Sequence, residues 1–143
     1  MATFLFKTEP GEFSFSDLMK GGVARWDGVS NPAANKHLCS MRKGDDVLVF
    51  HTGNEKAIVG LCRAVSDPYA DPKRPETTAA GEIKFVAIDV EAIKPAKAAV
   101  TLAQVKADAR FAKFPLVTQG RLSVMPVPEA LDRALRTMAG LKS

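Results

Sequence analysis

The chain has 143 residues, of which 46% are hydrophobic and 25% charged, and it carries a formal net charge of +4 at pH 7. This length and apolar content exclude a disordered chain and suit one globular domain over residues 1–143. No apolar run approaches the ~20 residues of a membrane-spanning helix, and no basic segment precedes a long apolar stretch at the N-terminus. We therefore expect no membrane contact and a cytoplasmic protein, and the alanine-rich composition indicates a bacterial source.

The N-terminal part predicts one strand and two short helices. Residues 2–9 alternate between apolar and polar, which is typical of a strand. Residues 14–22 have the spacing of a capping box at their start and two glycines at their end, so they predict a helix. Residues 23–29 show no regular pattern. Asn31 is then suited to be the N-cap of a helix over 32–41, which has proline at its first position.

The middle of the chain predicts three strands and a long loop. Residues 47–52 and 57–67 are typical of a hairpin, because a short polar turn separates two β-rich runs. Residues 67–82 contain three prolines and many acidic or small residues, and they predict a mobile loop. The next strand is predicted over 83–93, and Pro95 is expected to close it.

The C-terminal part predicts two helices around a short strand. Thr101 is suited to be the N-cap of one helix, residues 111–117 are predicted as a loop, 120–127 as a strand and 128–140 as an amphipathic helix. About five strands, mostly antiparallel, therefore interleave with short helices. This pattern predicts an α+β fold, a small and strongly bent antiparallel β-barrel or half-barrel surrounded by helices.

Few residues suit covalent or metal chemistry. His37 lies in the first turns of a helix and His51 ends a buried strand, where a hydrogen-bonded structural role is the alternative to a functional one, and no nucleophile motif accompanies them. His37 and Cys39 face different directions on their helix, so they do not share a metal ion. Cys39 and Cys62 are too few for a disulfide framework. We expect no metal, no cofactor and reduced thiols.

Lys7 and Glu9 are predicted to project from one side of the first strand. If that side faces a cavity, the pair can hold or polarise a small polar ligand. If it faces water, the pair is a surface ion pair worth ~0–1 kcal/mol. Strand alternation alone favours the surface.

Trp26 is the only tryptophan, and it precedes the polar turn Asp27-Gly28 that leads to a helix N-terminus. An aromatic face, free backbone N–H groups and a short acceptor are the parts that hold one unstacked nucleobase, and stacking contributes ~1–3 kcal/mol. The alternative is a hydrophobic plug that closes the turn. The sequence leaves both readings open.

Two segments of the chain are basic. Residues 20–44 carry five Lys or Arg against one acid, and residues 98–143 carry seven against three. Folded onto one face, these segments would attract a polyanion, whereas dispersed they are solvated surface charge. Arg121 and Ser123 are two residues apart in a predicted strand and would share a face. There an arginine can contact phosphate or a base edge, or form an inner ion pair.

The chain resembles the EVE domain family in five segments of fixed order, FLFKTEP, WDGVSN, MRKGDDVLVFHTG, AIVGLCRAVSDPYADP and RLSVMPV. The resemblance runs from about Phe4 to Val127 and implies a single EVE domain with a PUA-like fold, akin to YTH and ASCH domains. It implies binding of nucleic acid, DNA or RNA, that carries a modified base. Modified cytosines are proposed for some members.

The resemblance also implies a base pocket in which Trp26 stacks on the base, as the matching tryptophan does in the aromatic cage of YTH domains. The other implied pocket residues are Lys7, Thr8, Glu9, Asp27, Val29, Asn31, His51, Thr52, Arg121, Leu122 and Ser123. Phosphate contacts are expected from Lys20, Arg25 and Lys36. Family members often read WDGVRNYQARN, so Ser30 here stands where an arginine is common, with Lys36 as the substitute cation.

Three functions follow as hypotheses. The first is non-enzymatic reading of a modified base that is flipped or already unpaired. The second is hydrolysis of modified nucleosides, as in ASCH-like amidohydrolases, by Lys7, Glu9 and Thr52; Thr8 is expected to point away. The third is a protein-interaction module with an inert pocket. The oligomeric state is left open, a monomer included.

Overall fold

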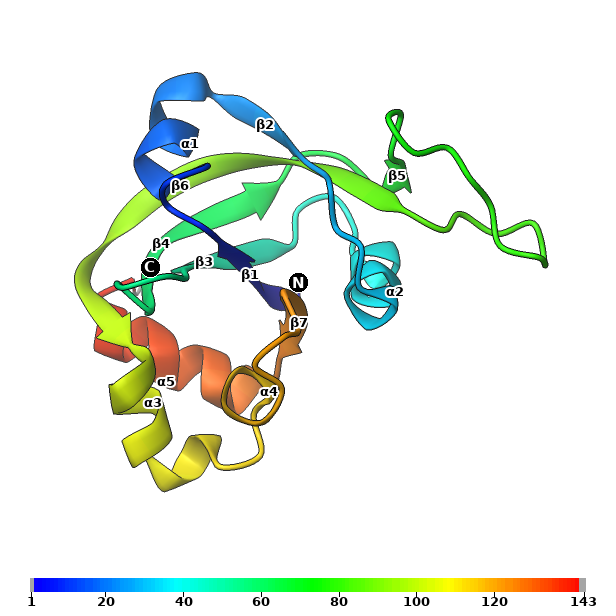
Figure 1. Ribbon diagram of the computed structural model, residues 1–143. Coiled ribbons are helices and arrows are strands. Elements are labelled where there is room, and N and C mark those ends of the chain that lie inside the picture. Colours follow the sequence, from blue (N-terminus) through cyan, green and yellow to red (C-terminus); the bar gives the residue numbers. More distant parts are fainter. Residues whose placement is uncertain (1, 142–143) are drawn as a thin grey trace.

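The computed structural model describes residues 2–141, which form a curled β-sheet with short helices around it (Figure 1). The strands are β1 (Thr3–Thr8), β2 (Val23–Trp26), β3 (Asp46–His51), β4 (Ala57–Ala64), β5 (Tyr69–Ala70), β6 (Val86–Thr101) and β7 (Val124–Val127). The helices are α1 (Phe15–Gly21), α2 (Pro32–Ser40), α3 (Leu102–Ala107), α4 (Pro115–Thr118) and α5 (Glu129–Ala139), with a 3₁₀ turn η1 (Ala109–Phe111).

The sheet is mixed and open, with the strand order β2-β6-β4-β3-β1-β7 and β5 attached to β6. The α+β class and the bent, largely antiparallel sheet are therefore confirmed, and the sheet is not closed into a barrel. Most neighbours are antiparallel, but β1 and β3 are parallel, because α1, β2 and α2 lie between them in the chain and supply the crossover. β1 lies between β3 and β7 and so bonds to a strand on each side.

The sheet curls until its two ends approach one another. α2 packs against both β6 and β7, which lie near opposite ends of the strand order. The pairing of β3 with β4 and of β4 with β6 contains register shifts, which bend strands. Gly60 of β4 lies directly under Phe15 of α1, and a Cβ there would come within 2.3 Å of that ring. Only glycine at position 60 therefore leaves room for α1 to pack against β4 at this bend.

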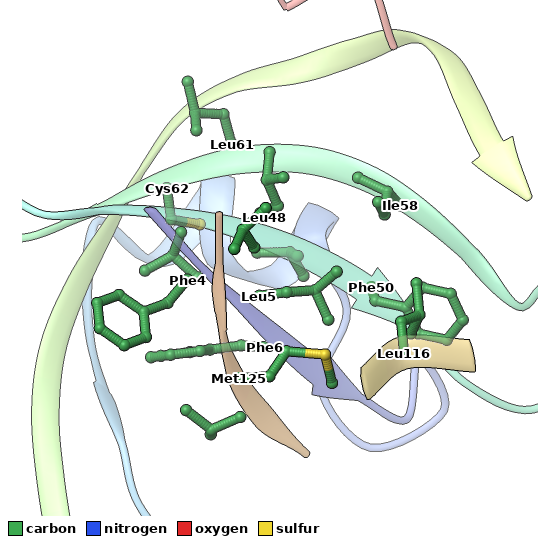
Figure 2. Close-up of a cluster of buried hydrophobic side chains, with 14 of the residues drawn as sticks. Phe4, Leu5, Phe6, Leu48, Phe50, Ile58, Leu61, Cys62, Leu116 and Met125 are labelled. Carbon is green, nitrogen blue, oxygen red and sulfur yellow. The ribbon is translucent and has the colours of Figure 1, made fainter. Parts of the chain in front are cut away.

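The core fills the inside of this curl (Figure 2). Leu5, Phe6, Leu48, Ile58 and Met125 are all fully buried, and they come from β1, β3, β4 and β7. Leu5 and Phe6 are successive residues of β1, so both faces of this strand are covered at that point. Alternation therefore did not identify a solvent face for β1.

Three expectations about strands are wrong. Residues 23–29, predicted as irregular, begin with β2, which pairs with β6. β6 continues through Pro95 to Thr101, because Pro95 lies opposite Gly60 next to a register shift, where a missing N–H is tolerated. The last strand begins only at Val124, so Arg121 and Ser123 precede it and do not share a strand face.

The predicted helix starts are confirmed, and one helix was missed. Asn31 caps α2 by accepting a hydrogen bond from the Ala34 N–H at 3.0 Å, and Thr101 caps α3 within a capping box. The predicted loop 111–117 contains the end of η1 and the start of α4. Within residues 2–141, no helix has the length and apolarity to cross a bilayer, and no group of three or more potential ligands could hold a metal ion.

Candidate functional site

A cavity of about 580 Å³ opens where β2 faces the end of β1. One wall is the end of β1 with the turn that follows it, and the other is the end of β2 with its turn. Ser123, just before β7, contributes from the third side. The lining residues are Lys7, Thr8, Glu9, Glu12, Phe13, Ala24, Arg25, Trp26, Asp27, Gly28, Val29, Ser30 and Ser123.

Trp26 belongs to both the core and the cavity. Its ring lies 5.1 Å from that of Phe6 and 6.0 Å from that of Phe13, measured between centroids. Only 8% of the residue is exposed, and it lines the cavity. The two readings of this tryptophan therefore combine, because the indole anchors the core on one side and borders an open hollow on the other.

A buried carboxylate holds the turn after Trp26. Gly28 has φ +74°, which favours glycine, and its N–H donates to Oδ2 of Asp71 at 3.3 Å. Asp71 is 1% exposed and also accepts from the Lys73 N–H and from Arg74. Burial opposes the charge of Asp71, but these hydrogen bonds and the Arg74 charge outweigh it and lower the pKa of the carboxyl.

Arg74 holds the same turn, and we call Asp71 and Arg74 together the clamp. Its guanidinium donates to the Val29 carbonyl and to the Ser30 hydroxyl, both at 3.0 Å, and it stacks 4.0 Å from the centroid of the Phe85 ring. The segment 67–82, expected to be a mobile loop, therefore reaches back and braces the cavity wall. A guanidinium thus lies at Ser30, supplied from 44 residues further along the chain.

The opposite wall is polar, with Lys7 half-buried and Glu9 exposed. Nζ of Lys7 donates to the Gly120 carbonyl at 3.0 Å, and burial lowers the pKa of this lysine. Glu9 accepts from the Gly11 N–H and from the Thr52 hydroxyl, each at 3.2 Å. Lys7 and Glu9 both line the cavity, and among the described residues they form no ion pair with each other.

The structure brings seven of the predicted pocket residues to the cavity: Lys7, Thr8, Glu9, Trp26, Asp27, Val29 and Ser123. Thr8 lines it together with Lys7 and Glu9, because β1 ends at Thr8 and strand alternation no longer governs Glu9. Arg25, expected to contact phosphate, also lines the cavity and is bonded to Asp27 at 3.1 Å.

The other five predicted residues do not line this cavity. Asn31 is occupied as the helix cap, and Leu122 is buried in the core. His51 accepts from the Phe15 N–H at 3.0 Å and is bonded to Glu55 at 2.6 Å, which is a structural role. Thr52 lines a neighbouring cavity, and Arg121 is exposed outside any strand.

Sequence reasoning missed Glu12, Phe13, Ala24, Gly28 and Ser30. Gly28 and Ser30 lie between the predicted residues Asp27, Val29 and Asn31, and this position in the sequence could have identified them. Glu12 and Phe13 follow a turn whose direction the sequence does not fix. Among the expected phosphate contacts, Lys20 and Lys36 are exposed and lie outside the cavity.

The open mixed sheet with short helices around it is a PUA-like fold, as the sequence predicted. Within that class, the family model of the EVE domain matches residues 2–138, and the chain belongs to the EVE domain family. Among curated proteins, none matches the chain.

Solved structures agree with this assignment. The NMR structure of Rpa0253 from Rhodopseudomonas palustris is 37% identical, with a TM-score of 0.88 over 100% of this chain and 96% of that chain. A hypothetical protein from Leishmania major is 31% identical, with a TM-score of 0.88 over 98% and 95%. Human THYN1 protein, in a crystal structure with DNA that contains 5-methylcytosine, is 23% identical, with a TM-score of 0.88 over 100% of both chains, and at that identity the likeness shows the fold alone.

Proposed function

We propose that the protein binds nucleic acid and holds one modified base in the cavity beside Trp26, without catalysing a reaction. The observation that carries this proposal is the cavity of about 580 Å³ that the sole indole borders together with polar side chains of both charges. The structure of human THYN1 with 5-methylcytosine DNA supports a ligand of this class.

The lining matches what a cytosine-type base offers. The exocyclic amine of cytosine donates hydrogen bonds, and Asp27 and Glu12 supply carboxylate acceptors in the lining. Its carbonyl accepts, and Lys7 supplies an ammonium donor. A methyl-sized modification can rest against the apolar side chain of Val29, and one such group is worth ~1–3 kcal/mol of discrimination.

The base has to leave its stack to reach the cavity, because a duplex hides its faces. Phosphates of the strand would then contact exposed cations, with Arg25 in the cavity lining and Lys20 and Lys36 outside it. Backbone contacts of this kind make the affinity depend on salt.

The hydrolase is the second candidate, and one contact favours it. The Thr52 hydroxyl donates to Glu9, and Lys7 has a lowered pKa, so the three residues expected for that chemistry lie in one region. Against it, Thr52 lines the neighbouring cavity and not the main one, and its hydroxyl is engaged by Glu9.

A fluorescence titration at fixed salt tests the proposal. Trp26 is the only indole, so quenching reports directly on the cavity. We expect saturable quenching by a modified cytosine nucleoside and less by the unmodified one. Absence of quenching by any nucleoside or oligonucleotide in a panel of modified bases would leave a protein-interaction module. Product formation seen by chromatography, and abolished by Lys7→Ala, would replace binding with hydrolysis.

A further inference from the structure

A second, smaller cavity of about 200 Å³ lies on the other side of Lys7 from the main one. Lys7 lines both cavities. The Glu9–Thr52 hydrogen bond joins a wall of the first to a wall of the second. The lining residues of the second cavity are Lys7, Phe50, Thr52, Gly53, Lys56, Leu102, Lys106, Leu116, Val117 and Gly120.

The charged residues that line it are all lysines, although the Glu9 carboxylate lies at its edge, against Gly53 and bonded to Thr52. Three lysines, Lys7, Lys56 and Lys106, contribute to the lining, and no acidic residue does. Within residues 2–141, none of the three forms a salt bridge. Three lysines that line one hollow make the local potential positive, which favours an anion there.

The floor of the second cavity is apolar, which strengthens that attraction. Phe50, Leu102, Leu116 and Val117 supply it, and charges interact more strongly beside such a surface than in open water. Lys7 is half-buried there, and burial lowers its pKa, so a bound anion would restore the stability of its charge.

The backbone places one lysine in an unusual conformation. Lys56 has φ +45°, and it is the one non-glycine residue with positive φ among those described. Its carbonyl accepts from the Leu102 N–H at 2.8 Å, which fixes this turn against the start of α3. Glycine or asparagine would adopt this conformation with less strain, so Lys56 is held in a backbone region that lysine seldom occupies.

We propose that the second cavity binds the phosphoryl group that flanks the base held in the main cavity, with Lys7, Lys56 and Lys106 around it. Two adjoining cavities that share one lysine match a nucleotide, whose base and phosphate are adjacent and differ in charge. The identity of this ligand rests on the proposed function, but anion binding by the three lysines can be measured without it.

The test compares a modified cytosine nucleoside with its 5′- and 3′-monophosphates by Trp26 quenching. For the wild-type protein we expect one monophosphate to bind at least about 10-fold more tightly than the nucleoside, a gain of about 1.4 kcal/mol. The double substitution Lys56→Gln/Lys106→Gln should remove most of this gain and leave nucleoside binding unchanged. Both side chains are exposed, so the variant keeps the core intact.

Lys43→Gln/Lys113→Gln is the matched control, because it removes the same charge from exposed lysines that line neither cavity. With a single-stranded oligonucleotide, substituting the lysine pair of the second cavity should lower the salt slope by about 0.7 for each phosphate that is no longer neutralised, and the control should not. Equal monophosphate affinities in the two double variants would overturn the proposal.

Inorganic phosphate separates this proposal from the base-binding one. Its titration should shift the amide resonances of Gly53 and Gly120 saturably in the wild type and not in Lys56→Gln/Lys106→Gln. Phosphate binding without any nucleoside binding would support the anion site and overturn base reading. Nucleoside binding without a phosphate response would overturn the anion site alone.

Discussion

The two walls of the main cavity are held in different ways. The end of β1 is fixed by backbone bonds on both sides, through its parallel pairing with β3 and through the Lys7 N–H, which donates to the Ser123 carbonyl just before β7. The turn after β2 lies at the edge of the sheet and is fixed by side chains of a distant segment, Asp71 and Arg74. One wall therefore moves only if the sheet unfolds, whereas the other can loosen while the sheet stays intact.

This difference separates stability from recognition. Trp26 packs against Phe6 of β1 and against Phe13, so it contacts both walls. Substitutions of Trp26 should change the free energy of unfolding and ligand affinity together. Substitutions in the clamp should act mostly on the turn, because local openings have lower free energies than global unfolding. The expected loss of stability is therefore larger for substitutions of Trp26 than for substitutions of the clamp residues Asp71 and Arg74.

Trp26→Ala should have the largest effect. The indole packs against Phe6 and Phe13 in the core, and replacing a buried tryptophan with alanine costs about 3–5 kcal/mol. Urea unfolding followed by far-UV circular dichroism measures this loss. Trp26→Phe is the control, since it keeps an aromatic ring and should lose less. A loss below about 1 kcal/mol for the alanine variant would mean that the indole is not part of the core.

Asp71→Ala should come next. It leaves the Gly28 N–H, the Lys73 N–H and Arg74 without their carboxylate, and unsatisfied buried groups cost about 1–3 kcal/mol. We expect faster hydrogen exchange at Gly28 and weaker nucleoside quenching, with exchange in β1 and β3 far less affected. Asp67→Ala is the matched control, because Asp67 accepts from the Lys43 N–H and lies at the surface of the same segment. Equal acceleration at Gly28 and in β1 would show that the two walls are one unit.

Local signals predicted the parts of the fold that depend on neighbouring residues. The Asn31 cap is one of them, because its hydrogen bond spans three residues. The contacts of Gly28 with Asp71 and of Val29 with Arg74 span 43 and 45 residues, and no periodicity reports on such pairs. Strand alternation favoured a surface position for Lys7, which is in fact half-buried and lines a cavity, and the reason is related. The sheet curl that brings β2 towards β1 arises from register shifts and from α2, both of which are tertiary features.

The smallest expected effect is a loosening of the clamp in acid. The pKa of Asp71 is lowered in the folded protein, so its contribution is complete above the unfolded value of about 3.9 and is lost as pH falls through the lower folded value. Asp17 and Asp108 also have lowered pKa values, so global acid unfolding does not isolate the clamp. The amide shift of Gly28, followed from neutral pH into acid, does. We expect it to titrate below the ordinary aspartate range in the wild type and to stay flat in Asp71→Asn. A Gly28 titration that persists in Asp71→Asn would assign the transition to another carboxylate, with Asp27 on the same turn as the first to substitute.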